Sequence, residues 1–261
     1  MSLIGECERC HGAGVVVIEK MTGADIYGKD KPLIYTEPCP VCRGGHDVKV
    51  QKVRQRANIP PSFYENRMSD FKWDEYLDDK GEVINLEKQR KFIESFINNF
   101  EKWDERGLGL YIWSNIRGTG KTFLASCICN ELMDKLPMVT KFVSASELIQ
   151  MDTQDQKKNY EKNQIDVLRE CKLLVLDDLG QKKTGEEWLD DILFRIIDYR
   201  YQNKLTTIIT SNIELKKIRL DDRVSDRLNK MCQPIPLPEF SFRQKESTQN
   251  KKEFFKEMGL M

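Results

Sequence analysis

Residues 110–122 read Leu-Tyr-Ile-Trp-Ser-Asn-Ile-Arg-Gly-Thr-Gly-Lys-Thr, and this stretch decides the fold. An apolar run over 108–113 predicts a buried strand, and the residues from 121 to 135 predict a helix. The glycines between them let backbone N–H groups approach a phosphate closely. The helix that follows adds the positive end of its dipole. The pattern therefore predicts a P-loop, because a chance turn would lack the strand before it and the helix after it.

The residue types of the loop assign its chemistry. Lys121 is expected to reach the β- and γ-phosphates of a nucleotide, and the Thr122 hydroxyl is expected to bind Mg²⁺. The residues expected to surround the phosphates with them are Asn115, Arg117, Gly118, Thr119 and Gly120. Asn115 stands where the motif usually has its first glycine. We expect it to be tolerated there because Asn adopts positive φ more readily than most residues.

A second motif supplies carboxylates. The apolar run 173–176 ends in Asp177 and Asp178, which is typical of a Walker B strand. Asp177 is predicted to hold Mg²⁺ through water, and Asp178 is predicted to polarise the attacking water. The alternative is a buried strand with solvated ends. The Asn-Lys pairs at Asn203 and Asn229 lack the Asp of guanine-reading GTPases, which favours ATP over GTP.

Beyond the loop, short apolar runs alternate with helical patterns. Strands are predicted over 108–113, 138–143, 173–176, 206–210 and 235–237, with helices between them. This alternation predicts an α/β core with a parallel sheet. The predicted organisation is a cysteine module over 1–47, a basic linker and connecting helix over 48–107, an ATPase core over 108–240 and a charged tail over 241–261.

Four of the eight cysteines form two Cys-x-x-Cys pairs. These are Cys7, Cys10, Cys39 and Cys42. Four thiolates at this spacing can close a tetrahedral Zn²⁺ site, and a site without an open position is structural. His11 and His46 follow the pairs and are expected to be bystanders, although either could replace a cysteine ligand. A disulfide framework is the alternative, and the lack of a secretory signal argues against it.

Bulk composition limits the surroundings of the protein. Lys+Arg and Asp+Glu are 42 each, so no net charge draws the whole chain to nucleic acid. No run of about 18 apolar residues occurs, so no membrane partner and a cytoplasmic location are expected. The basic stretch 43–58 is either a phosphate-contacting segment or a solvated linker. Nearby Phe71, Trp73 and Tyr76 are expected to pack rather than to stack on bases.

Residues 55–243 resemble the bacterial replicative helicase loaders of the DnaC/DnaI type and the related IstB-like ATPases. The resemblance covers about seventy per cent of the chain. The segments that carry it are 59–61, 109–113, 128–132, 176–180, 198–201, 210–212 and 222–228, and Arg243 matches a terminal arginine of the family.

The resemblance implies a P-loop AAA+ ATPase whose C-terminal lid is reduced or absent. It implies that the chain loads a DnaB-type replicative helicase onto single-stranded DNA at the initiation of replication, assembles as an ATP-dependent homo-oligomer and binds the helicase through its zinc module. Arg227, with Arg223 nearby, would be an arginine finger, and Asn212 would position the attacking water. A surface ion-pair helix and a simple helix cap are the alternatives for the arginines and for Asn212.

Two other functions fit parts of the pattern. A transposition ATPase of the IstB type shares the ATPase core, although the cysteine module fits a loader better. A non-hydrolysing ATP-binding adaptor is favoured only by Asn115 in place of glycine. Measured ATP turnover separates the adaptor from the other two.

Overall fold

The computed structural model describes residues 53–136, 138–148, 150–151, 164–180, 187–245, 254–256 and 258, and the backbone of 15–22 and 31–38. The chain divides into two compact units, Met1–Arg56 and Ala57–Met261. The segment from 57 to 107, predicted as part of a connecting region, thus belongs to the same unit as the core. The physical reason is its buried apolar side chains, which include Ile59, Phe71 and Tyr76.

The first unit contains a β-hairpin that the sequence patterns did not predict. Strand β1 (Val15–Thr22) pairs antiparallel with β2 (Lys31–Pro38). Val15 pairs with Pro38, and Thr22 pairs with Lys31. The eight residues between the strands lack the two-residue turn signal that marks a short hairpin, which is why the pattern was missed.

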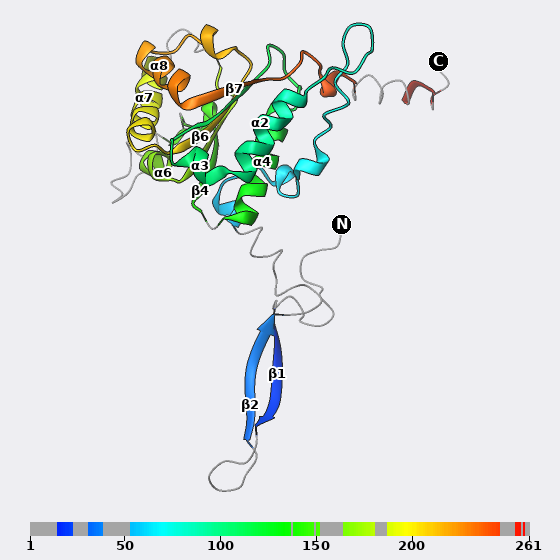
Figure 1. Ribbon diagram of the computed structural model, residues 1–261, viewed down its shortest axis with the longest axis vertical. Helices are drawn as coiled ribbons and strands as arrows, with labels where there is room; N and C mark the ends of the chain where they lie inside the picture. The colour runs from blue at the N-terminus through cyan, green and yellow to red at the C-terminus, as the bar shows by residue number, and fades with distance from the viewer. Residues whose placement is uncertain are drawn as a thin grey trace. The chain divides into compact units, whose positions relative to one another are not determined.

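The second unit is built on a five-stranded sheet with the order β4-β5-β6-β3-β7 (Figure 1). All four pairings are parallel. The strands are β3 (Gly109–Trp113), β4 (Thr140–Ser144), β5 (Leu173–Asp177), β6 (Thr206–Ser211) and β7 (Cys232–Pro236). The predicted parallel α/β core is therefore confirmed, and β6 lies beside β3, the strand that precedes the P-loop.

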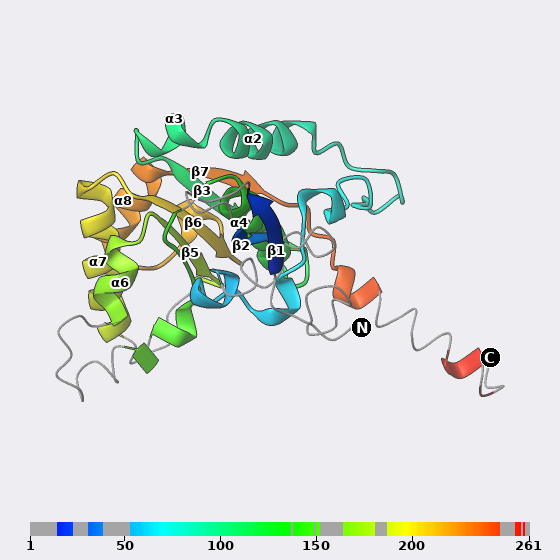
Figure 2. The same ribbon diagram turned by 90° about the horizontal axis from the view of Figure 1, so that it is seen from below.

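Helices cover both faces of this sheet. Figure 2 shows α2 and α3 on one side and α6 and α7 on the other. The first set is α2 (Glu87–Asn98), α3 (Phe100–Asp104) and α4 (Lys121–Lys135), and the second is α6 (Gln164–Glu170), α7 (Glu187–Gln202) and α8 (Asp222–Met231). Alternate strand residues serve the two faces: Leu110 and Ile112 join the core cluster of the first set, and Tyr111 joins that of the second.

Shorter elements complete the unit. Single 3₁₀ turns lie at Pro61–Phe63, Met68–Asp70 and Leu215–Lys217. Ser144 and Glu147 form a capping box after β4: the Ser144 N–H donates to Glu147 Oε2 at 2.7 Å, and the Glu147 N–H donates to Ser144 Oγ at 3.3 Å. Each helix in the part of the chain that the structure describes is too short or too polar to span a bilayer.

Arg200, near the end of α7, ties the second face together. Its side chain is fully buried and donates to the carbonyls of Leu168 at 3.0 Å, Cys171 at 2.7 Å and Thr206 at 2.5 Å. Burial lowers the pKa of the guanidinium. Because these carbonyls lie at the end of α6 and at the start of β6, Arg200 fixes the register between helix and sheet.

Candidate nucleotide site

The loop after β3 has the backbone shape of a phosphate cradle. Gly118 and Gly120 adopt φ of 80° and 85°, in the left-handed region that favours glycine. A Cβ at Gly118 would meet Ser241 Oγ at 2.7 Å, and one at Gly120 would meet Tyr76 Oη at 3.3 Å. The two glycines are therefore required both by conformation and by the close approach of neighbouring segments.

Lys121 is the first residue of α4, and its side chain contacts the loop that precedes the helix. Its side chain is buried, and Nζ donates to the Ile116 carbonyl at 2.7 Å and to Thr119 Oγ1 at 3.2 Å. Burial lowers the pKa of the ammonium to about 8, although the nearby Asp178 and Asp177 oppose the shift. The structure thus places a cation at the first turn of α4, facing both Walker B carboxylates.

The predicted magnesium ligands lie together. Thr122 Oγ1 donates to Asp177 Oδ1 at 2.9 Å, and Thr210 Oγ1 donates to the same oxygen at 2.6 Å. Burial raises the pKa of Asp177, and the two hydroxyl hydrogen bonds oppose that shift. Hydroxyl and carboxylate oxygens are the ligands that Mg²⁺ prefers, so the residues present fit this metal. Thr210, at the end of β6, had no predicted role.

Asp178 is held in an uncommon conformation. Its φ is 53°, and its N–H donates to Thr210 Oγ1 at 2.9 Å. Non-glycine residues at positive φ are uncommon and cluster at functional sites. Asn212 Nδ2 donates to Asp178 Oδ1 at 2.7 Å, so the structure joins the two residues predicted to handle water. The buried Asn212 Oδ1 has no hydrogen-bond partner among the described residues.

Residues 238–243, named here the C-terminal strap, run along the P-loop. Ser114 Oγ donates to the Pro238 carbonyl at 3.2 Å, and the Phe242 N–H donates to the Gly118 carbonyl at 2.9 Å. Asn115 Nδ2 donates to a carboxylate oxygen of Glu239. Asn115 is not among the described residues with positive φ, so our expected reason for an asparagine here is wrong. Its side chain instead fastens the strap.

Arg223 and Arg227 lie on α8 and contact α7. Arg227 Nε donates to Asp198 Oδ1 at 2.7 Å. Both guanidinium groups lie over the ring of Phe194, that of Arg223 at 4.1 Å and that of Arg227 at 5.0 Å from the ring centre. Arg223 also bonds Asp221 at the helix N-cap. Among the described residues neither arginine bonds a residue of its own P-loop. Arg117 lies in the loop with its side chain exposed.

The predicted zinc cysteines Cys7, Cys10, Cys39 and Cys42 lie outside the described residues, as do His11 and His46. Within the described ranges no group of three or more His, Cys, Asp or Glu side chains could hold a metal together. The other four cysteines, Cys127, Cys129, Cys171 and Cys232, are buried and form no disulfide among the described residues. Cys127 and Cys232 are core residues, and their burial raises the pKa of each thiol to about 12.

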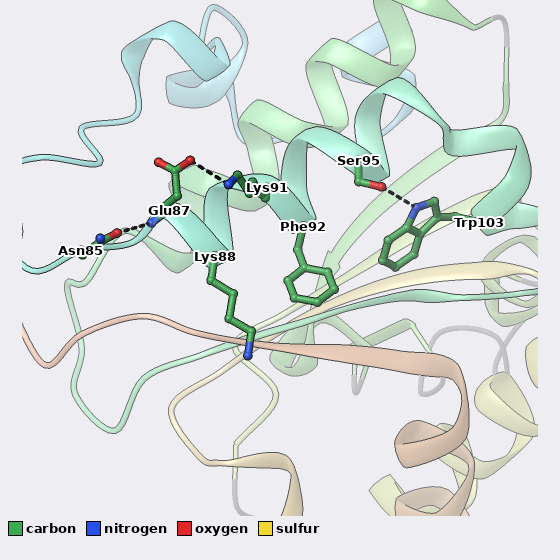
Figure 3. Close-up of a pocket in the computed structure, with 7 residues that line it drawn as sticks. All are labelled: Asn85, Glu87, Lys88, Lys91, Phe92, Ser95 and Trp103. Carbon is green, nitrogen blue, oxygen red and sulfur yellow. Dashed lines mark hydrogen bonds and ion pairs between the residues drawn. The ribbon is translucent and has the colours of Figure 1, made fainter.

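An open groove of about 710 Å³ lies on α2 and α3, outside this site (Figure 3). The rings of Phe92 and Trp103 line it, and Lys91, at its rim, pairs with Glu87 at 3.1 Å. No residue predicted to bind nucleotide lines the groove.

The fold and site define a P-loop ATP-binding protein of the AAA+ class. The glycine loop and Lys121 follow β3, the Walker B carboxylates lie at the end of β5, and β6 lies between these two strands. The chain belongs to the family described as IstB-like ATP binding protein, whose model matches residues 112–250.

Two curated helicase loaders are similar to the chain. "Replicative helicase loader DnaC" of Escherichia coli K12 is 28% identical over 189 residues, which cover 71% of this chain and 72% of that protein. "Replicative helicase loader DnaI" of Bacillus subtilis 168 is 27% identical over 120 residues, 44% of this chain and 36% of that protein. A crystal structure of DnaI superposes with a TM-score of 0.55 at 25% identity, covering 68% of this chain and 94% of that one.

Three contributors to the site were missed from the sequence: Tyr76, Thr210 and Glu239. Thr210 was recognised as part of a family motif but given no chemistry, and its position at the end of a strand beside β3 was a usable signal. Tyr76 and Glu239 lie 43 residues before Thr119 and 124 residues after Asn115, so only the tertiary fold brings them to the loop.

Proposed function

We propose that the chain is an ATP-hydrolysing loader of a DnaB-type replicative helicase. The observation that carries the ATPase part is the meeting of Thr122 and Thr210 on Asp177, beside Lys121 and Asp178. Two motifs 55 residues apart in sequence form one oxygen-rich site there. This pairing of a P-loop with acidic strand ends is the arrangement that nucleotide hydrolysis needs.

Nucleotide binding follows from the loop. The amides from Gly118 to Lys121 would hold the phosphates, and Asn115 and Arg117 would flank them. Lys121 would release its contacts with Ile116 and Thr119 and turn to the phosphates. Mg²⁺, when bound by Thr122 and Asp177, neutralises charge on the phosphates.

Hydrolysis follows from the neighbouring strand ends. Asp178 would accept a proton from the attacking water, and Asn212 Oδ1 would accept a hydrogen bond from the same water. The support is that Asn212 already donates to Asp178, and that its buried Oδ1 has no partner within the described structure. An acceptor in that state gains a hydrogen bond from a water that binds beside both side chains.

Charge stabilisation from a neighbouring subunit is assigned to Arg227, with Arg223 as its companion. Arg227 is held by Asp198 and Phe194 on the α7–α8 flank and does not reach its own loop. An arginine at the surface and away from its own loop is suited to act on the nucleotide of a stacked copy, so the proposal includes an ATP-dependent homo-oligomer.

Helicase loading rests on the relatives. The two curated relatives described above are replicative helicase loaders, and one of them is matched over 72% of its length. We therefore assign this chain a DnaB-type helicase and single-stranded DNA as partners in DNA replication, and the bacterial cytoplasm as its place of work.

A Zn²⁺ ion in the first unit completes the proposal. Val15, five residues after Cys10, pairs with Pro38, the residue before Cys39. The hairpin supports the proposal because it brings together two residues that are near the two cysteine pairs in sequence, and a shared tetrahedral site needs both pairs. Zinc measured on the purified protein should be one per chain, and Cys7→Ser with Cys39→Ser should abolish it.

The loader proposal is tested with the ring helicase of the same cell on single-stranded DNA circles. We expect the chain to bind the helicase and to raise the amount deposited on the circles, with ATP turnover that responds to single-stranded DNA. Failure of the wild-type chain to bind any ring helicase, together with turnover indifferent to single-stranded DNA, would remove the loader assignment.

The match to the IstB-like family supports a second candidate function, that of a transposition ATPase of the IstB type. Such a protein acts on duplex target DNA. Filaments on duplex DNA that form only with ATP, seen by electron microscopy without any helicase, would favour this candidate over the loader.

A further inference from the structure

Two backbone carbonyls of the P-loop accept hydrogen bonds from segments far away in sequence. The Phe242 N–H of the C-terminal strap donates to the Gly118 carbonyl at 2.9 Å. The Tyr76 hydroxyl donates to the Thr119 carbonyl at 2.7 Å. The loop is thus fastened on its outer side by one residue that precedes it and one that follows it.

These two contacts determine where the loop amides point. A trans peptide unit is planar, so the C=O of one residue and the N–H of the next point in opposite directions. Fixing the Gly118 carbonyl turns the Thr119 N–H away from the strap, and fixing the Thr119 carbonyl turns the Gly120 N–H away from Tyr76. Amides held in this way form the concave anion site of a P-loop.

Tyr76 itself is firmly held. Its side chain is fully buried, with ring centres of Phe71, Phe240 and Phe242 at 6.1, 6.0 and 5.0 Å. Burial raises the pKa of the phenol far above neutral, so the hydroxyl remains a proton donor. A Cβ at Gly120 would lie 3.3 Å from this hydroxyl, so the hydroxyl lies close against the backbone of the loop.

We infer that Tyr76 is a positioning residue for nucleotide binding: through the Thr119 carbonyl it orients the Gly120 N–H toward the phosphates. The inference rests on the proposed nucleotide site and adds a residue outside the P-loop and Walker B motifs. The hydroxyl of Tyr76 contacts the loop backbone, so its proposed effect needs no contact with the nucleotide. Its effect is carried by one peptide plane, in parallel with the effect of the Phe242 N–H on the plane before it.

The chain offers a matched control. Tyr111, in β3, is also fully buried, and its hydroxyl donates to the Ile213 carbonyl at 2.9 Å. Replacing either tyrosine with phenylalanine removes one hydroxyl, keeps the ring and leaves one carbonyl without its donor. A purely structural role predicts the same consequences for both replacements.

The experiment compares Tyr76→Phe and Tyr111→Phe in the full chain. Calorimetry measures Kd for Mg-ADP and for a non-hydrolysable Mg-ATP analogue, well below the Tm of each variant. We expect Tyr76→Phe to weaken both by roughly five- to fifty-fold, and Tyr111→Phe to change them less than about twofold. The ³¹P resonance of the bound ADP β-phosphate should move only in Tyr76→Phe.

Equal affinities and unchanged ³¹P positions in all three proteins would overturn the role of Tyr76 while leaving the nucleotide site intact. Absence of binding by the wild-type chain would overturn both. If Tyr76→Phe loses affinity only as far as Tyr111→Phe does, the hydroxyl is a structural contact and the inference fails.

Discussion

The P-loop and the arginine helix α8 hold their proposed functional groups against different partners. Around the loop, Lys121, Thr122 and Asp177 are fixed by hydrogen bonds within the subunit. On α8, Arg227 is only partly buried and depends on an ion pair and a ring face of α7. Groups that act within one subunit can be built in advance, whereas a group that acts on a neighbour has to remain at the surface.

The largest expected effect is on ATP hydrolysis beside the P-loop. Asp178→Asn should lower ATP turnover by about 10²–10⁴, because a proton acceptor is lost. Mg-ATP affinity should stay within about threefold, since Asp177 and Thr122 remain. Single-turnover hydrolysis and calorimetry measure the two quantities. Asp79→Asn, at an exposed position, is the control, and undiminished turnover in Asp178→Asn would refute the role of Asp178.

The second effect concerns Arg227 on α8 and its contribution to ATP turnover. Arg227→Ala should lower turnover by about 10²–10³ once subunits assemble, because a charge that stabilises the transition state is lost. Its affinity for nucleotide should be unchanged. Mixing it with Lys121→Ala subunits should restore activity, because those subunits still supply Arg227.

Lys230→Ala, on the same helix and paired with Asp226, is the control for this prediction. No recovery on mixing, at concentrations where the two variants co-assemble, would show that Arg227 acts within its own subunit or not at all.

The third effect concerns the affinity of the P-loop for Mg-ATP. Lys121→Ala should weaken Mg-ATP binding by roughly 10–100-fold, the range for lost hydrogen bonds to a charged group. Lys135→Ala, at the other end of α4, should bind normally. A Lys121→Ala protein with wild-type affinity would place the phosphates elsewhere.

The sequence anticipated these two regions unequally. The P-loop and Walker B residues were predicted correctly as neighbours, because an apolar strand, glycines and a helix start are encoded within a few consecutive residues. The contact of Asn115 with the strap and the hydrogen bond of the Tyr76 hydroxyl were not predicted, because they depend on segments that only the folded core brings to the loop. Arg200 was seen as part of a motif, yet its buried carbonyl contacts follow from packing between α6, α7 and β6.

The smallest expected effect is a pH dependence of the loop. With a pKa of about 8, Lys121 is mostly charged at pH 7 and mostly neutral at pH 9. Bound phosphates raise that pKa, so the complex holds more protons than the free protein above pH 8, and affinity must fall as pH rises.

Affinity for Mg-ADP should therefore drop about tenfold from pH 7 to pH 9, with proton uptake visible by calorimetry in buffers of different ionisation enthalpy. Lys121→Arg should flatten the profile, because guanidinium keeps its charge over this range. Affinity that rises between pH 8 and pH 9 would contradict the placement of Lys121.

The proposed nucleotide site is tested by a crystal structure of the chain with Mg²⁺ and a non-hydrolysable ATP analogue. We expect phosphate oxygens within hydrogen-bonding distance of the amides from Gly118 to Lys121, and Mg²⁺ between the side chains of Thr122 and Asp177. A nucleotide bound elsewhere, or a loop whose amides turn away from the phosphates, would contradict it.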